Sequence, residues 1–444
     1  MVNDFIKNIV DELKVIKTEQ FFGSVSAVQG LFIEVKGINA NLSIGDRCLV
    51  INNQNKKVPC EVVAFKEDNI LVMPYASMDG IGKGCQVEVI DAAPIIYPHH
   101  SWLGRIINAF GEPLDGKGPL IKGKIPYLIK ASPPAAAFRD RVAGKVDLGL
   151  KAVNTFTTIC KGQRMGIFAG SGVGKSTMMS SMARNTDCDI SVIGLIGERG
   201  REAKEFIEDV LGEDGLKKSV LVLATSDESP LMRRQAAYTT LAVSEFFRDD
   251  NKNVLCLMDS ITRFAMAQRE IALSVGEPPA SKGYTPSVFS ELPKLLERAG
   301  PGQGNGTITG LFTVLVDGDD HNEPIADAVR SIIDGHIVLD RAIAERNRYP
   351  AINILKSISR TMPDCNDDRQ NAIVNQAKKY IATYEDMAEL IRLGAYKKGS
   401  SPEVDQAIFY YPQIEVFLSQ EKNECFRFDE CYDILENILN SKAV

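Results

Sequence analysis

The sequence of 444 residues lacks the long apolar runs of a membrane protein. Its longest apolar segments, such as residues 308–316, have the length of a strand and fall far short of the roughly 20 residues that a helix needs to cross a bilayer. The pattern of a signal peptide is also missing, because Asp4, Asp11 and Glu12 stand where a charged and then apolar leader would lie. We therefore expect a cytoplasmic protein with no membrane-spanning segment.

Cysteine spacings typical of metal sites or of disulfide frameworks are absent as well. The nine cysteines, among them Cys48, Cys160, Cys188 and Cys256, fall at no such spacing. We expect them to be small, buried or half-buried hydrophobic residues in a reducing compartment. The sequence also has no internal repeat of solenoid length and no low-complexity segment, which argues against a repeat protein and against a largely disordered one.

A strong excess of one charge is missing too. The formal net charge is -7, which argues mildly against a protein that mainly coats nucleic acid, although a local basic pore is compatible with it. With 44% hydrophobic and 25% charged residues, the composition is that of an ordinary soluble globular protein. The length predicts two or three domains.

Three segments lie outside the central part of the chain, two before it and one after it. Residues 1–22 carry apolar side chains at helical spacing, which predicts an amphipathic helix that either packs on its own domain or docks a partner. Residues 23–92 contain short β-like runs separated by turns and predict a small β-barrel. Residues 369–444 are expected to form a C-terminal helical domain, with a first helix that stops at Gly394. The apolar positions of the N-terminal helix are Phe5, Ile6, Ile9, Val10, Leu13 and Ile16.

The segment between them, residues 93–368, is expected to form the central domain. A proline-punctuated stretch leads into a region where apolar runs alternate with longer helical patterns. Such near-continuous runs are typical of parallel strands covered on both faces, so we predict a doubly wound α/β core. The runs lie at 165–169, 190–196, 220–224, 254–258 and 311–316.

A glycine-rich motif follows the first of these runs. It reads Gly-Ser-Gly-Val-Gly-Lys-Ser-Thr and precedes a stretch of helical character, which is the layout of a phosphate-binding P-loop. Backbone N–H groups and the positive end of a helix dipole surround a polyphosphate in such a loop, and Lys175 adds a mobile charge. The strict pattern has glycine where this chain has Ala169, but Gly170 and Gly172 keep the turn open. We therefore predict that a nucleoside triphosphate is bound by Gly170, Ser171, Gly172, Val173, Gly174, Lys175, Ser176 and Thr177.

Phosphoryl transfer also needs a metal ion and a group that orients the attacking water. Ser176 can offer its hydroxyl to Mg²⁺, and Asp259, at the end of an apolar run, can hold the water shell of the metal. Glu198, just beyond another run, can polarise water. By themselves, Asp259 is more typical of a helix cap and Glu198 of a solvated helix start, so both assignments depend on the P-loop.

Four motifs together resemble the catalytic subunits of rotary ATP synthases and their relatives. They are the P-loop, Gly-Glu-Arg-Gly-Arg-Glu at 197–202, Leu-Met-Asp-Ser-Ile-Thr-Arg-Phe at 257–264 and Pro-Ala-Ile-Asn-Ile-Leu-Lys-Ser-Ile-Ser-Arg at 350–360. Within that superfamily the chain looks most like the ATPases of type III protein export, because residues 393–405 resemble their C-terminal signature. The runs 316–327 and 334–339 are similar to the flagellar branch in particular. The resemblance implies a RecA-like P-loop NTPase core with a parallel sheet, a small N-terminal β-barrel and a C-terminal helical domain.

The resemblance also implies roles for single residues. The phosphates, metal and water are assigned to Lys175 (β- and γ-phosphates), Ser176 (magnesium), Glu198 (lytic water), Arg199 (γ-phosphate region) and Asp259 (outer shell of the metal). Arg360 matches an arginine that reaches into the site of the neighbouring subunit. No aromatic residue follows Arg360 directly, so Phe417 and Tyr411 are the candidates for contact with adenine. His321 and His336 are expected to have no ligand role.

The function implied is that of an Mg-dependent ATP hydrolase, a homohexameric ring peripheral to the inner-membrane export apparatus, that releases export substrates from chaperones. The implied partners are a stator-like regulator at the N-terminal helix, a central stalk protein, and chaperones with their substrates, with no nucleic acid. Two alternatives remain. A rotary ATP synthase subunit predicts an acidic rotor-contact loop, and an RNA-dependent hexameric translocase of the termination-factor type predicts an aromatic and basic platform near residues 23–91, where few aromatics occur.

Overall fold

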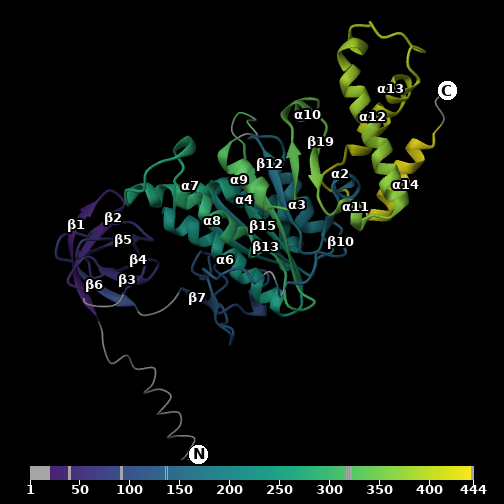
Figure 1. Cartoon of the computed structure of the whole chain (residues 1–444). Coiled ribbons are helices and arrows are strands. Elements are labelled where there is room, and N and C mark those ends of the chain that lie inside the picture. Colours follow the sequence, from purple (N-terminus) through teal and green to yellow (C-terminus); the bar gives the residue numbers. More distant parts are fainter. Residues whose placement is uncertain are drawn as a thin grey trace, which may run out of the picture. The chain divides into compact units, whose positions relative to one another are not determined.

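The computed structural model describes residues 21–38, 42–90, 94–135, 137, 139–316, 318, 320 and 323–441 (Figure 1). These residues belong to two compact units. The first contains the chain up to Ile95 together with 229–231 and 270–278, and the second contains the remainder. The sequence at 1–20, where an amphipathic helix is predicted, lies outside the described residues, as does His321.

The first unit is a closed six-stranded barrel with the order β1-β2-β5-β4-β3-β6. Buried and less buried residues alternate along β2 and β3, and the inward side chains of Ile33, Val35 and Val50 are completely buried. This confirms the predicted small β-barrel. Its strands are β1 (Phe22–Gln29), β2 (Phe32–Lys36), β3 (Arg47–Ile51), β4 (Lys57–Lys66), β5 (Asn69–Pro74) and β6 (Gln86–Ile90).

The second unit is built around a nine-stranded sheet with the order β19-β18-β12-β17-β15-β13-β14-β8, and β16 (Gly300–Pro301) pairs with β17 off this path. The strands from β18 to β8 run parallel, and β19 is antiparallel to β18 at the edge. On β15 every residue from Val254 to Asp259 is buried, as expected for a strand covered on both faces. The strands are β8 (Ile106–Ile107), β12 (Arg164–Ala169), β13 (Ile190–Glu198), β14 (Ser219–Thr225), β15 (Asn253–Asp259), β17 (Thr307–Leu315), β18 (Gly335–Leu339) and β19 (Ile352–Ser359).

Helices connect these strands, which confirms the predicted α/β core with a parallel sheet. The P-loop follows β12, Glu198 ends β13 and Asp259 ends β15. Because β12, β17, β15 and β13 are consecutive parallel neighbours, their carboxyl ends meet at one edge of the sheet. The helices are α2 (Lys151–Phe156), α3 (Lys175–Asn185), α4 (Gly200–Glu205), α5 (Gly212–Lys217), α6 (Pro230–Asp249), α7 (Ile261–Ser274), α8 (Pro286–Leu296), α9 (Pro324–Ile332) and α10 (Arg341–Glu345).

The end of the chain is helical, as predicted, and comprises α11 (Met362–Cys365), α12 (Asp368–Arg392), α13 (Pro402–Leu418) and α14 (Phe428–Leu439). A capping box between Asp367 and Gln370 starts α12, and Gly394, with φ of +68°, follows its C-terminal end. The helices α12, α13 and α14 pack against one another, as Figure 1 shows at the yellow end of the chain.

Two of the expectations from absent features can be compared with the described part of the chain. None of its helices is long and apolar enough to span a membrane. Seven cysteines are buried and Cys365 is half-buried, but Cys425 is exposed, so the prediction is wrong for that residue. Cys425 lies in the loop between α13 and α14, where residues 421–425 are all exposed. His336, on β18, lies with its Nε2 3.0 Å from the carbonyl oxygen of Lys356 on the neighbouring strand, in keeping with the structural role expected for it.

Candidate active site

The P-loop has the geometry that phosphate binding requires. It connects the end of β12 to α3, whose first residue is Lys175. Gly172 and Gly174 have φ angles of +76° and +88°, in the left-handed region that favours glycine. A Cβ atom at Gly174 would also lie 3.3 Å from the ring of Tyr349, so a side chain there would crowd the loop. The backbone N–H groups at the start of α3 are therefore available to an anion.

Lys175 lies between two carboxylates. Its Nζ atom is 3.7 Å from Oε1 of Glu198 and forms an ion pair with Oδ1 of Asp259. Asp259 is buried at the end of β15, and Glu198 is half-buried at the end of β13. One ammonium group thus faces two acidic groups, and the cluster favours an additional cation.

Thr313, which the sequence analysis did not single out, orients Asp259. Its hydroxyl donates a hydrogen bond of 2.7 Å to Oδ1 of Asp259. Thr313 lies in the middle of β17, between the strands that carry the P-loop and Asp259, and it is completely buried. The only sign of it in the sequence is a threonine within the otherwise apolar run Leu311–Leu315.

Glu198 titrates near neutral pH. Burial raises the pKa of its carboxyl group, and the negative charge of Asp259 raises it further, whereas Lys175 lowers it, with a result of about 7. Its Oε1 atom is buried and accepts no hydrogen bond from the described residues. A carboxylate with an unused oxygen and a pKa close to the working pH is suited to accept a proton from water.

The donors around the cluster fit a magnesium ion. Ser176, in the first turn of α3, is exposed, and its hydroxyl is a hard oxygen donor. The carboxylates of Asp259 and Glu198 supply further oxygens and more negative charge than Lys175 neutralises. Mg²⁺ prefers oxygen ligands and one or two carboxylates together with substrate phosphates.

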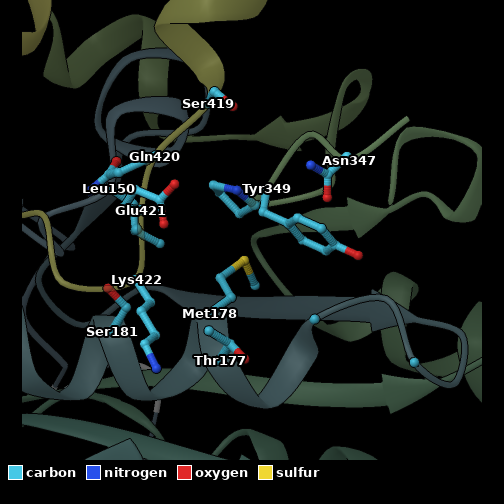
Figure 2. A pocket seen from close by; sticks show the side chains of 13 residues that line it. Leu150, Thr177, Met178, Ser181, Asn347, Tyr349, Ser419, Gln420, Glu421 and Lys422 are labelled. Atoms are coloured by element: carbon cyan, nitrogen blue, oxygen red, sulfur yellow. The ribbon is translucent and has the colours of Figure 1, made fainter. Parts of the chain in front are cut away.

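A pocket of about 490 Å³ adjoins the P-loop (Figure 2). In Figure 2, Thr177, Met178 and Ser181 face it from α3, Tyr349 borders it on one side, and the segment 419–422 borders it on the other. This size and the mixture of an aromatic ring with polar groups suit a nucleoside.

The two residues predicted to contact adenine lie outside this pocket. Phe417 is 3% exposed in the helical core, where its ring lies beneath the ammonium of Lys151, and Tyr411 stacks on Tyr384 with ring centroids 3.8 Å apart. Neither of these two candidates lines the pocket, whereas Tyr349 does. Tyr349 stands directly before the motif that begins at Pro350, and so it precedes Arg360 in the sequence. The two predicted candidates both follow Arg360.

The structure brings together Lys175, Glu198 and Asp259, but it places the two predicted arginines differently. Arg199 is exposed, and its guanidinium lies 3.6 Å from the carboxylate of Glu202. Arg360 is exposed directly after β19, the strand at the edge of the sheet. A side chain at this edge is accessible to another molecule.

Three family models match the chain. The nucleotide-binding domain of the ATP synthase alpha/beta family matches residues 149–359, and the beta-barrel domain of the same family matches residues 25–89. The T3SS EscN ATPase C-terminal domain matches residues 366–437. The three matches correspond to the sheet with its helices, the six-stranded barrel and the C-terminal helices.

Individual proteins are similar over almost the full length. The flagellum-specific ATP synthase of Caulobacter vibrioides is 55% identical over 443 residues, covering 98% of this chain and 100% of the relative. The assembled ATPase EscN of the enteropathogenic E. coli type III secretion system has a TM-score of 0.89 and 39% identity, and the alignment covers 94% of this chain and 100% of EscN. EscN in complex with its central stalk EscO gives a TM-score of 0.86 at 38% identity with the same coverage.

Proposed function

The chain belongs to the ATP synthase alpha/beta family and is an ATPase, and we propose a specific role for it. It is an Mg²⁺-dependent ATP hydrolase that energises type III protein export. The observation that carries the proposal is the cluster of Lys175, Glu198 and Asp259 beside the P-loop. It combines phosphate binding, a metal site and a base for water at one edge of the sheet.

In this proposal each group has one task. The N–H groups of residues 170–177 and the ammonium of Lys175 bind the phosphates. Ser176 and Asp259 would hold Mg²⁺, which would supply positive charge against the phosphate oxygens. Glu198 accepts the proton of the attacking water. Arg199 serves the γ-phosphate region, and Tyr349 stacks on the base.

We further propose that catalysis requires a ring of identical chains. EscN, which is similar over 94% of this chain, was solved as an assembled ATPase. The exposed position of Arg360 at the sheet edge supports its assignment as a finger that reaches the nucleotide of a neighbouring chain. An arginine supplied in trans makes hydrolysis conditional on assembly. A homohexamer is the ring that the resemblance implies.

The proposed partners follow from the relatives. A central stalk protein is supported by the complex of EscN with EscO, and the names of the flagellar relatives favour flagellar export over an injectisome. Chaperones with their export substrates, and a stator-like regulator at residues 1–18, complete the set. With these partners the chain would act in the cytoplasm, peripherally at the inner-membrane export apparatus.

The loop between α12 and α13 favours export over ATP synthesis. A synthase subunit predicts an acidic rotor-contact loop, but residues 393–401 contain Lys397 and Lys398 and no acidic residue. The match of residues 366–437 to the C-terminal domain of a secretion ATPase points the same way.

Steady-state ATPase activity measured against protein concentration tests the proposal. Turnover per chain should rise with concentration as rings form, stop when Mg²⁺ is chelated, and stay unchanged when RNA is added. Stimulation by RNA would support the translocase alternative instead. Turnover that is independent of concentration, in a protein shown by light scattering to dissociate over the same range, would contradict the need for assembly.

A further inference from the structure

Gln163 is a completely buried polar residue whose side chain contacts both neighbours of Arg360. Its Oε1 atom accepts a hydrogen bond of 2.8 Å from the hydroxyl of Thr361, and its Nε2 atom lies 2.9 Å from the hydroxyl of Ser359. Gln163 itself stands immediately before β12. A single amide group therefore holds the chain on either side of the exposed arginine.

The backbone of Arg360 is held from the same place. The N–H of Arg360 donates a hydrogen bond of 3.0 Å to the carbonyl oxygen of Asp334, and Nε2 of Gln163 donates to that same oxygen at 3.2 Å. The carboxylate of Asp334 is in turn fixed by the guanidinium of Arg164, through two hydrogen bonds of 3.0 Å. The residues before and at the start of β12 thus fix the backbone on which the guanidinium of Arg360 is mounted.

The remaining contact of Gln163 fixes the amide group itself. Its Oε1 atom also accepts a hydrogen bond of 2.8 Å from the backbone N–H of Cys160, so the side chain is tied to the turn that precedes β12. Buried hydrogen bonds restrict the groups that they join, and a network of them favours one arrangement of those groups. Such a network is suited to hold an exposed side chain in one direction.

We propose that Gln163 is a positioning residue that fixes Arg360 for its reach into the nucleotide site of the neighbouring chain. This inference rests on the proposed role of Arg360. Gln163 acts only through Arg360 and touches no nucleotide. Its replacement should therefore lower the rate of hydrolysis and leave ATP binding unchanged, since a finger contributes mainly in the transition state.

The test uses the full-length chain carrying Gln163→Leu, a side chain of similar size without hydrogen-bonding groups. We expect kcat to fall roughly 10²-fold, the scale of the loss when a catalytic group is displaced by about 1 Å, with KM within about twofold of wild type. Ser357→Ala is the matched control. Ser357 is buried on the same strand, and its hydroxyl bonds Asn353 and Val338 rather than the flanks of Arg360, so kcat should stay close to wild type.

Mixed rings separate a positioning role from a general structural one. A Gln163→Leu chain has an intact pocket and a displaced finger, whereas a Lys175→Ala chain has a damaged pocket and a good finger. Rings mixed from these two chains should regain part of the activity. Rings mixed from Gln163→Leu and Arg360→Ala should not, because both chains then offer defective fingers.

The outcomes distinguish this inference from the role of Arg360 itself. If Arg360→Ala is rescued by Lys175→Ala but Gln163→Leu is not, in rings shown by cross-linking to be mixed, Gln163 has no positioning role. If Arg360→Ala is not rescued either, Arg360 does not act in the site of the neighbouring chain, and this inference fails together with that assignment. A folded Gln163→Leu chain with near-normal turnover would also overturn the inference. Should Gln163→Leu not fold, Thr361→Val removes one half of the contact, and the same rescue pattern is expected with a smaller loss.

Discussion

The Nζ atom of Lys175 lies 3.7 Å from Oε1 of Glu198, and the same ammonium pairs with Asp259. The two carboxylates therefore share the positive charge of Lys175. A polyphosphate in the P-loop would compete for this ammonium, and each carboxylate would then be available to a cation or to water. The partner that the ammonium group of Lys175 contacts therefore connects nucleotide binding to Glu198 and Asp259.

Replacing Lys175 by Ala should weaken nucleotide binding, because it removes a charge-assisted contact worth about 1.5–3 kcal/mol, or roughly 10- to 150-fold in affinity. Replacing Glu198 by Gln keeps the shape of the side chain but removes the base, so binding should be spared. Hydrolysis should collapse in both variants. Equilibrium binding of a fluorescent nucleotide and steady-state turnover measure the two effects, and near-normal turnover in Glu198→Gln would show that the assignment of Glu198 is wrong.

The raised pKa of Glu198 predicts how activity depends on pH. With a pKa of about 7, set first by burial and then by Asp259, the carboxyl group is protonated below neutrality and cannot accept a proton from water. The value of kcat/KM should therefore fall as the pH decreases through about 7. A profile that stays flat between pH 5.5 and 8 would contradict this prediction.

The same group should affect stability in the opposite direction. The folded chain binds the proton of Glu198 more tightly than the unfolded chain, whose glutamates titrate near 4.5. Its contribution to the free energy of unfolding is therefore present below pH 4.5 and is lost as the pH rises through about 7. Denaturant unfolding at pH 5 and pH 8 should show a smaller decrease for Glu198→Gln than for wild type.

Replacing Arg360 by Ala should leave ATP binding close to wild type and lower turnover by roughly three or more orders of magnitude. Mixing this variant with Lys175→Ala places some intact fingers against intact pockets, so activity should partly return. If Arg360 only stabilised its own domain, the melting temperature would fall and no mixing ratio would restore activity. Cross-linking the mixed rings provides the control that both chains are present.

Tyr349 borders the pocket beside the P-loop, and stacking of a base on an aromatic ring is worth about 1–3 kcal/mol. Tyr349→Ala should therefore weaken ATP binding roughly 5- to 150-fold, while Tyr349→Phe should retain most of the affinity. Tyr411→Ala is the matched control, because Tyr411 stacks on Tyr384 in the helical domain and should affect the melting temperature rather than binding. Equal losses of affinity in the two alanine variants would contradict this assignment.

Deleting residues 1–18 should spare nucleotide binding and abolish association with a stator-like regulator. The segment carries the apolar stripe from Phe5 to Ile16 and precedes all the residues of the P-loop site. A pull-down with the purified regulator measures the effect. Capture of the regulator by the truncated chain would end the proposal.

The sequence predicted the central cluster because its members follow strands whose apolar runs are easy to recognise. Glu198 and Asp259 come directly after β-like runs, and the ends of parallel strands meet at one edge. The barrel, the α/β core and the helical end were predicted for the same reason, namely that their periodicities are local. The phosphate-binding loop could be predicted because all of its residues belong to one continuous motif.

The residues that were missed depend on contacts between distant segments. Tyr349 belongs to the pocket only because its loop approaches Gly174 and the segment 419–422. Thr313 and Gln163 are single polar residues within or beside apolar strands, and nothing in their immediate sequence says which partners they meet. Tertiary packing determines such partners, and local periodicity does not report it.

The strand β12 is six residues long, which corresponds to roughly 20 Å. Gln163 precedes its first residue, and the P-loop follows its last. The loop proposed to bind a chain's own nucleotide and the glutamine that holds both flanks of Arg360 therefore adjoin opposite ends of one strand. A displacement of β12 along its axis would move both the P-loop and Gln163. Nucleotide occupancy in one chain and the rate of hydrolysis in the neighbouring chain would then be linked. We therefore expect a ring of such chains to hydrolyse ATP cooperatively.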